Sequence, residues 1–342
     1  MLCTIGDLIE DVVVWLNSEP KNQLNIGSDT DSVIMRTRGG SAANVAMFSA
    51  LTGTPSRFIG QVGNDNLGEQ LCASLRESGV EVCTVAKGRT GSIVVIVQPN
   101  GERTFLTDRG VASELSVFDA SHLADVSIVH VPTYSLALDP LATTAVQYIR
   151  AARATGALIS IDASSTSVLR NYGVDRYGAL IASIAPDVFL CNSDEAALLN
   201  LDSAHPMPGA ELTVIKRGAL PVMAISSAGT ITTADAVTEV ATPPVAKIVD
   251  TTGAGDAFAA GFLPTYASSR NVEEAITRGN SIAARVLRSP GATLEARWKR
   301  ILQLSVSAMK CVMHLHLIAL SLHLSRPFFR TSVCRRPLMP RR

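Results

Sequence analysis

Residues 250–262 read Asp250-Thr251-Thr252-Gly253-Ala254-Gly255-Asp256-Ala257-Phe258-Ala259-Ala260-Gly261-Phe262. The two close glycines predict a turn, and the small and apolar residues after them predict a helix that begins at this turn. A helix leaves the N–H groups of its first turn without intrahelical partners, and the positive end of its dipole lies behind them. The segment therefore predicts an anion site with the carboxylate of Asp256 beside it.

Three interpretations of this segment compete. In the first, Asp256 only complements the helix dipole and the glycines only form a turn. In the second, Gly253-x-Gly255 begins a dinucleotide-binding turn, but that fingerprint needs a third glycine where the chain has Phe258. In the third, the anion is a phosphate, and Asp256 accepts the proton of a hydroxyl that attacks the phosphorus. We favour the third interpretation, phosphoryl transfer to an alcohol, because other segments also fit it.

The segment resembles the signature of the ribokinase-like carbohydrate kinases, the PfkB family, which phosphorylate sugars and nucleosides from ATP. The resemblance implies that Asp256 is the catalytic base and that the backbone of Gly253, Ala254 and Gly255 forms an anion hole. It also implies a three-layer α/β/α domain with a mostly parallel sheet and a small β-sheet lid over the sugar. ATP and Mg²⁺ are the implied cofactors.

Two further segments resemble the sugar-binding elements of the family. A glycine pair precedes an apolar helix that ends before Gly53, and Ser41 is the predicted N-cap of this helix. The family binds sugar hydroxyls with the glycine pair and an asparagine, which implies Gly39, Gly40 and Asn44.

An acidic segment follows the first predicted strand. In the family, an aspartate at the offset of Asp11 binds the sugar, which implies this residue as a substrate ligand. Asp7 and Glu10 are rivals for the role, and a solvated acidic turn is the alternative interpretation.

The sequence Asn192-x-x-Glu195 follows an apolar strand and predicts a capping box at the start of a helix. The family uses this asparagine and glutamate to organise Mg²⁺ and its waters near the nucleotide phosphates. An indirect role suits Mg²⁺, which keeps several waters and needs few protein ligands. The resemblance therefore implies both residues in cofactor binding, with Glu195 as an indirect Mg²⁺ ligand.

Other positions resemble the nucleotide side of the family's site. Lys216 and Gly218 lie in a strand and turn that approach the phosphates, although Pro221 stands near the place of an expected second glycine. Asn280 matches a position beside the adenine, and an exposed helical asparagine is the alternative interpretation. Asp250 and Thr252 match positions that hold a monovalent cation, K⁺, in ribokinase.

Runs typical of strands alternate with helical patterns at 2–5, 57–61, 126–131, 157–162, 187–191, 212–216 and 222–226. This alternation predicts a mostly parallel sheet with helices on both faces and an active site at the carboxyl ends of its strands. Segments at about 10–38 and 90–107 have β-like alternation without helices, and we interpret them as a small antiparallel sheet. Such a lid excludes water that competes with the sugar. In relatives the lid often pairs two subunits, which implies a homodimer.

Basic residues in or near the lid have two interpretations. They either bind a charged group of the substrate or lie on the solvated surface. These residues are Lys87, Arg89, Arg103 and Arg109.

The formal net charge of zero hides an asymmetry along the 342 residues. Nine of the 30 basic residues and none of the 30 acidic residues lie in 298–342, so residues 1–297 are acidic. We expect a kinase domain at 1–297, with no nucleic-acid partner. We expect residues 298–342 to be a basic tail that is unrelated to the family and has no catalytic role.

The six cysteines have irregular spacings without a C-x-x-C pair, which is typical of reduced thiols in a cytoplasmic protein. The apolar run at 311–324 is shorter than the roughly 20 residues that span a bilayer, so we expect no membrane contact. We also expect no signal peptide.

The prediction is an ATP- and Mg²⁺-dependent sugar kinase in the cytoplasm. A nucleoside kinase of the adenosine type and a catalytically inactive sugar- or nucleotide-binding protein are the alternatives.

Overall fold

The computed structural model describes residues 1–16, 24–25, 27–98, 103–227 and 237–294. The chain divides into two compact units, 1–295 and 296–342, and all of the described residues belong to the first. The predicted tail at 298–342 lies outside the described residues. The boundary of the predicted kinase domain at residue 297 therefore stays a prediction.

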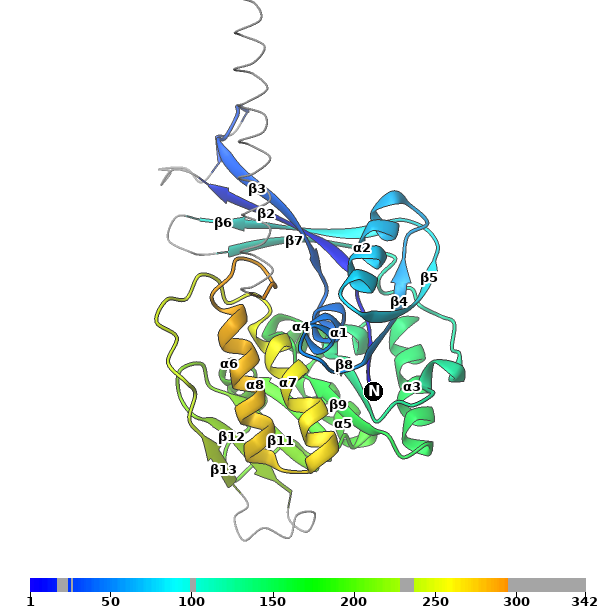
Figure 1. The fold of residues 1–342 in the computed structure, drawn as a ribbon, viewed down its shortest axis with the longest axis vertical. Coiled ribbons are helices and arrows are strands. Elements are labelled where there is room, and N and C mark those ends of the chain that lie inside the picture. The colour runs from blue at the N-terminus through cyan, green and yellow to red at the C-terminus, as the bar shows by residue number, and fades with distance from the viewer. Residues whose placement is uncertain (17–23, 26, 99–102, 228–236, 295–342) are drawn as a thin grey trace, which may run out of the picture. The chain divides into compact units, whose positions relative to one another are not determined.

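A nine-stranded sheet forms the centre of the first unit, in the order β13-β12-β11-β10-β9-β8-β1-β4-β5 (Figure 1). The strands from β11 to β5 in this order pair in parallel, and β12 and β13 are antiparallel additions at one edge. The prediction of a mostly parallel sheet is confirmed. Its strands are β1 (Leu2–Ile5), β4 (Ser56–Val62), β5 (Val80–Ala86), β8 (Ile128–Pro132), β9 (Leu158–Asp162), β10 (Val188–Asn192), β11 (Leu212–Lys216), β12 (Val222–Ser226) and β13 (Val237–Val240).

The seven strands predicted from the sequence are present, and β5 and β13 are additional. These two lie at the edges of the sheet, where one side of a strand has no neighbour. The buried runs that reveal central strands are absent from both: all but one of their residues are at least partly exposed.

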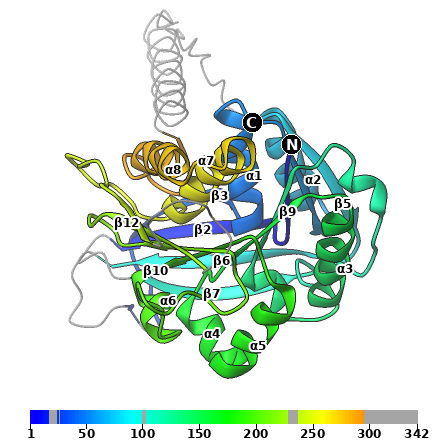
Figure 2. The same ribbon diagram turned by 90° about the horizontal axis from the view of Figure 1, so that it is seen from below.

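Helices cover both faces of the large sheet, which gives the three predicted layers (Figure 2). One face packs against α1 (Ser41–Leu51), α2 (Asn66–Glu77), α7 (Ala254–Ser269) and α8 (Val272–Val286). The other face packs against α3 (Leu141–Ala154), α4 (Thr166–Tyr172), α5 (Val174–Ile184) and α6 (Ser193–Leu198), and two short 3₁₀ helices, η1 (Ala120–Leu123) and η2 (Thr133–Leu136), lie among the loops.

Alternate residues of each central strand point into different cores. Leu2 and Val188 belong to the core under α1, α7 and α8, whereas their neighbours Cys3 and Phe189 belong to the core under α3 and α5. This is the period of two that a strand imposes on its side chains. Because both faces are buried, these strands are predominantly apolar.

A second sheet has the strand order β3-β2-β6-β7 and lies above the carboxyl edge of the first (Figure 1). The prediction that this lid is wholly antiparallel is wrong at its centre, where β2 and β6 pair in parallel. The reason is topological: β2 follows β1 and β6 follows β5, and these two strands of the large sheet point the same way. The lid strands are β2 (Ile9–Leu16), β3 (Ser32–Gly39), β6 (Thr90–Val97) and β7 (Arg103–Gly110).

The lid also exposes large apolar side chains, among them Ile34 and Leu106, which are 60% and 55% exposed. Homodimerisation through this sheet stays a prediction. Within the described parts of the chain, no helix combines the length and the apolar character that crossing a bilayer requires.

Helices α7 and α8 cross at glycines. A Cβ atom on Gly279 would lie 2.8 Å from the ring of Phe258, and one on Gly261 would lie 2.8 Å from the Arg278 carbonyl oxygen. Phe258 in turn stacks on Phe262 with ring centroids 5.6 Å apart. The absence of side chains at Gly261 and Gly279 thus lets α7 and α8 pack closely. This packing fixes the position of α7, whose first turn carries Asp256.

We predict that Gly279→Ala lowers the free energy of unfolding by about 1–3 kcal/mol, because the added methyl group displaces Phe258. The matched control is Gly178→Ala in α5, where a Cβ meets nothing within 4 Å. There alanine should be neutral or stabilise by up to about 1 kcal/mol, because it is the better helix former. Urea unfolding of both variants tests the pair, and equal effects would contradict this account of the crossing.

Candidate active site

A cavity of about 1130 Å³ lies between the lid and the carboxyl ends of the parallel strands. The residues that follow successive strands line it: Asp7 after β1, Tyr134 after β8, Ser164 after β9 and Gly218 after β11. The start of α7 and one face of the lid complete the walls. The predicted location of the site at the carboxyl edge of the sheet matches this cavity.

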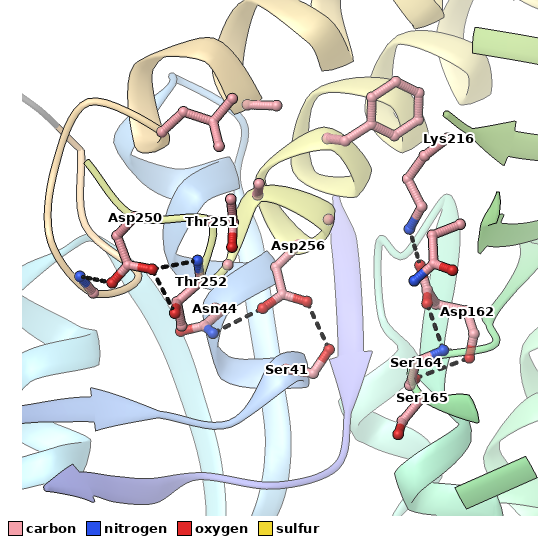
Figure 3. Close-up of a pocket in the computed structure, with 18 of the residues that line it drawn as sticks. Ser41, Asn44, Asp162, Ser164, Ser165, Lys216, Asp250, Thr251, Thr252 and Asp256 are labelled. Carbon is pink, nitrogen blue, oxygen red and sulfur yellow. Dashed lines mark hydrogen bonds and ion pairs between the residues drawn. The ribbon is translucent and has the colours of Figure 1, made fainter. Parts of the chain in front are cut away.

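Asp256 lies in the first turn of α7 and faces the first turn of α1 (Figure 3). The Ser41 hydroxyl donates to Oδ1 of Asp256 over 2.7 Å, and Nδ2 of Asn44 donates to Oδ2 over 2.8 Å. The prediction that Ser41 caps α1 is wrong. Gly40 occupies the N-cap position, and the hydroxyl of Ser41 is bound to Asp256 instead.

The pKa of Asp256 is raised to about 6, first of all because the carboxylate is buried. The hydrogen bonds from Asn44 and Ser41 act in the opposite direction, since they stabilise the charged form. A carboxylate with a raised pKa that keeps one side open to a cavity is able to accept a proton at neutral pH.

The predicted anion hole is a turn that requires glycine. Gly253 has φ of 76°, in the left-handed region, and a Cβ there would lie 2.7 Å from the Cβ of Ala292. The Ala254 N–H donates to the Thr251 carbonyl over 3.2 Å, which leaves the following N–H groups of the first helical turn without intrahelical acceptors. A Cβ on Gly255 would lie 3.4 Å from Nζ of Lys216, so a cationic side chain is close to this turn.

The glycine pair lets the segment between β1 and β2 approach α1. A Cβ on Gly39 would lie within 2.5 Å of the carboxylate oxygens of Asp11, and one on Gly40 would lie 2.3 Å from the backbone carbonyl of Asp7. Gly40 and Asn44 line the cavity. Gly39 does not line it, but it leaves the space that the Asp11 carboxylate occupies. Asn44 is 5% exposed, and its Oδ1 accepts a hydrogen bond from Arg38 over 2.8 Å. Both ends of this amide are therefore engaged within the protein.

The three candidate acidic ligands of the substrate, Asp11, Asp7 and Glu10, differ in whether they line the cavity. Asp11 and Asp7 line the cavity, but Glu10 does not. The Glu10 carboxylate instead contacts Arg36 over 3.3 Å and accepts a hydrogen bond from Ser92. Asp11 lies within the lid strand β2, so this segment is not the solvated turn of the alternative interpretation, and burial raises the pKa of Asp11 to about 6.

The lid presents a mixed row, with three polar residues and one isoleucine, and then an apolar row to the cavity. Strand register places Asp11 beside Thr37 and Ile93, with Thr107 opposite Ile93. The next row consists of Val13, Val95 and Phe105, and all members of both rows line the cavity.

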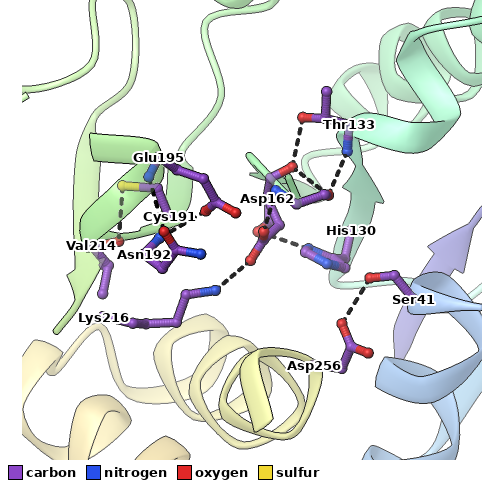
Figure 4. Close-up of polar contacts among 12 residues, drawn as sticks. Ser41, His130, Thr133, Asp162, Cys191, Asn192, Glu195, Val214, Lys216 and Asp256 are labelled. Atoms are coloured by element: carbon purple, nitrogen blue, oxygen red, sulfur yellow. Dashed lines mark hydrogen bonds and ion pairs between the residues drawn. The ribbon is translucent and has the colours of Figure 1, made fainter. Parts of the chain in front are cut away.

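The predicted capping box at α6 is confirmed. The Asn192 side chain accepts the Glu195 N–H over 2.9 Å, and the Glu195 carboxylate accepts the Asn192 N–H over 2.8 Å. Glu195 is 2% exposed, and its pKa is raised to about 7 by burial and then by the negative charge of Asp162 (Figure 4).

Lys216 forms an ion pair with Asp162, with Nζ 2.7 Å from Oδ2 (Figure 4). Burial alone would lower the pKa of Lys216, but the carboxylates of Asp162 and Glu195 raise it. The ammonium group is therefore charged, and it lies between these carboxylates and the turn at Gly255.

Asn280 lines the cavity and is 6% exposed, so the alternative of an exposed helical asparagine is wrong. Its Nδ2 donates to the Ala241 carbonyl over 3.4 Å. Gly218 also lines the cavity. Its φ of 63° lies in the left-handed region, which glycine adopts without strain. Pro221 directly precedes β12 and leaves the pairing of β11 with β12 intact.

Asp250 and Thr252, the predicted monovalent-cation ligands, face a guanidinium group. Arg103 donates to Asp250 Oδ1 over 2.6 Å and to the Thr252 hydroxyl over 2.7 Å. Of the other basic residues near the lid, Arg109 lines the cavity, whereas Arg89 pairs with Asp108 on the surface. Among the described residues, no group of three or more His, Cys, Asp or Glu side chains has the arrangement of a metal site.

A profile of the pfkB family of carbohydrate kinases matches residues 2–299. The chain belongs to this family. As a pfkB family kinase it is a phosphotransferase with an alcohol group as acceptor. It is 28% identical to a fructokinase of Vibrio alginolyticus over 257 residues, which cover 73% of this chain and 82% of that enzyme.

Two further comparisons agree with this assignment. The chain is 30% identical to an ATP-dependent ribose-1-phosphate kinase of Halopiger xanaduensis over 269 residues, which cover 74% and 81% of the two chains. The crystal structure of adenosine kinase from Sinorhizobium meliloti has a TM-score of 0.72 at 25% identity, over 85% of this chain and 94% of that one.

The contacts of three residues at the candidate site were not predicted from the sequence: Ser41, Asp162 and Arg103. Asp162 ends β9 at the carboxyl edge of the sheet, and this placement was the available signal. The contacts of Ser41 and Arg103 join segments 215 and 147 residues apart, and local sequence carries no trace of them.

We predict that Ser41→Ala raises the pKa of the Asp256 carboxyl above its value of about 6. A hydrogen bond to a charged group contributes about 1.5–3 kcal/mol, and its loss favours the protonated form. Carbon-13 NMR titration of labelled aspartate measures the change. The control is Ser49→Ala, also in α1, whose hydroxyl donates to the Ala260 carbonyl and leaves Asp256 untouched. An unchanged titration in Ser41→Ala would contradict the assigned contact.

Proposed function

We propose that this chain transfers the γ-phosphoryl group of ATP to a hydroxyl of a sugar, with Asp256 as the catalytic base. The observation that carries the proposal is the position of Asp256 at the glycine turn of α7, where its carboxylate borders a cavity large enough for a sugar and a nucleotide. The family assignment and the name of the ATP-dependent ribose-1-phosphate kinase support the same reaction.

The geometry suggests how the chain's own groups act. The acceptor hydroxyl lies against Asp256, which takes its proton as the oxygen attacks the phosphorus. Ser41 and Asn44 hold the carboxylate in place, so no reorganisation is needed at that moment. The N–H groups that follow Ala254 in the first turn of α7, the helix dipole and the nearby Lys216 ammonium stabilise negative charge on the transferring group.

The sugar side of the cavity offers acceptors for hydroxyl groups. Asp11 and Asp7 line it, and Asp11 projects from the lid strand β2. The lid therefore contributes directly to binding as well as covering the site. We propose that Gly39 and Gly40 act by leaving space for Asp11 and for the backbone at Asp7. Asn44 orients the base and remains within reach of the acceptor.

The proposed nucleotide side offers a cationic donor for phosphate, Lys216, and oxygen atoms, on Asn192 and Glu195, that suit the waters of Mg²⁺. We assign Lys216 and Gly218 to the phosphates and Asn280 to the adenine, and the support is that all three residues line the cavity. The pocket-lining Asn192 and Glu195 would hold the waters of the Mg²⁺ that accompanies ATP, and the bound ion would neutralise phosphate charge. A divalent cation near Glu195 would lower the raised pKa of this carboxyl group, because it favours the charged form.

A nucleoside acceptor is the second candidate, and one observation favours it. Phe105 lines the cavity and remains 58% exposed, beside the apolar Val13 and Val95. An exposed aromatic ring next to an apolar row is suited to the flat face of a nucleobase. The similarity to adenosine kinase in fold agrees with this alternative.

The decisive experiment measures ADP release from Mg-ATP with pentoses, hexoses, phosphorylated sugars and nucleosides as acceptors. We expect turnover with one class, and a loss in Asp256→Asn of about 10²–10⁴ in kcat, because proton transfer is removed while acceptor binding persists. Calorimetric titration of the acceptor checks that binding. A variant that loses binding and turnover equally would contradict Asp256 as the base, and silence with every acceptor would favour a binding protein.

We predict that Glu195→Gln raises the Mg²⁺ concentration for half-maximal activity about tenfold, since it removes one charge near the metal's waters. Glutamine still accepts the Asn192 N–H, so the capping box and the stability should persist. The control is Asp194→Asn, a neighbouring exposed carboxylate that does not line the cavity. The same Mg²⁺ dependence in the two variants would refute the role of Glu195.

A further inference from the structure

Arg103 places a positive charge at the base of the predicted anion hole. It is the first residue of the lid strand β7, yet its guanidinium group contacts the loop before α7 through two separate nitrogens. Its side chain is 25% exposed and that of Asp250 is 14% exposed, so the ion pair is largely removed from water. A planar guanidinium that contacts two groups at once fixes their relative position.

Asp250 in turn organises the loop that leads into the glycine turn. Its Oδ1 accepts hydrogen bonds from the N–H and the hydroxyl of Thr252, each over 2.8 Å (Figure 3). Its Oδ2 accepts the N–H of Gly291 over 2.9 Å. Burial would raise the pKa of Asp250, but the donors from Thr252 and Gly291 and the charge of Arg103 hold it below its ordinary value. The carboxylate is thus charged and needs a cation nearby.

The oxygens that would ligate a monovalent cation are already committed. Oδ1 of Asp250 receives three donors, two from Thr252 and one from Arg103. The Thr252 hydroxyl donates to Asp250 and accepts from Arg103. A K⁺ ion at these oxygens would have to displace the guanidinium group, so the predicted K⁺ site does not fit the arrangement of this chain.

We propose that Arg103 is a built-in cation that takes the place of a diffusible monovalent cation at the anion-hole loop. It is a positioning residue: it acts on the turn at Gly253 through Asp250 and Thr252. Because Arg103 belongs to the lid, the charge is in place only while the lid rests on the loop. Arg103 thereby links the lid to the loop before α7.

The proposal that Arg103 replaces a monovalent cation is tested by thermal stability, a measurement that does not depend on the proposed function. The melting temperatures of the full chain and of Arg103→Ala are compared in K⁺ and in N-methylglucamine at equal ionic strength. We expect equal values for the wild type, and a rise of at least about 2 °C with K⁺ for Arg103→Ala, whose vacated oxygens bind the ion. Arg103→Met, which keeps an apolar stem, repeats the test if the alanine variant does not fold.

The matched control is Arg89→Ala, which removes another arginine that pairs with the lid, through Asp108, and lies outside the cavity. It should respond to K⁺ as the wild type does. A wild type stabilised specifically by K⁺ would overturn the proposal. So would an Arg103→Ala variant that is indifferent to K⁺.

The positioning role rests on the proposed function and is tested by turnover. We expect Arg103→Ala to lose about tenfold or more in kcat and to regain part of it with K⁺ or added guanidinium ion. The wild type and Arg89→Ala should not respond. Full activity of Arg103→Ala without added cation would refute the positioning role. If the wild type turned over no acceptor at all, the proposed function would fail, and the melting temperatures alone would decide the cation assignment.

Discussion

The contact between the first turns of α1 and α7 is the interaction on which the rest of the site depends. Ser41 and Asn44 from one helix hold both oxygens of Asp256 in the other. Burial favours the neutral acid, and the two hydrogen bonds favour the charged form. The balance leaves a pKa of about 6, which gives a carboxylate that is ionised at neutral pH and is still a useful base.

Glycines make this contact possible because they allow backbone segments to approach. Gly40 brings the start of α1 against the backbone at Asp7, and Gly253 brings the start of α7 against Ala292. The parallel sheet then delivers Asp162, Asn192 and Lys216 to the same edge, because all parallel strands end there. The proposed base, acceptor wall and phosphate side thus come from distant parts of the chain.

The fold was predictable from the sequence because local patterns carry it, and most of the candidate site residues named from such patterns line one cavity. Alternating strands and helices indicate the parallel sheet, and the glycine turn before Asp256 marks the start of α7. Other features depend on tertiary contacts. The parallel pairing of β2 with β6 follows from where β1 and β5 lie, and the partners of Ser41 and Arg103 lie on remote segments. Ser41 follows two glycines and therefore has the sequence pattern of a helix cap. Only the structure shows that its hydroxyl binds Asp256 instead.

The central claim is that the Asp256 carboxylate accepts the proton, and the pH dependence of kcat/KM tests it most directly. Its pKa is raised from the ordinary value, so activity should fall as the pH drops through about 6 and Asp256 becomes protonated. In Ser41→Ala this acidic limb should move to higher pH, together with the titration of the carboxyl group. An acidic limb at the same pH in both proteins would contradict the account, because the group that controls turnover would then not be Asp256.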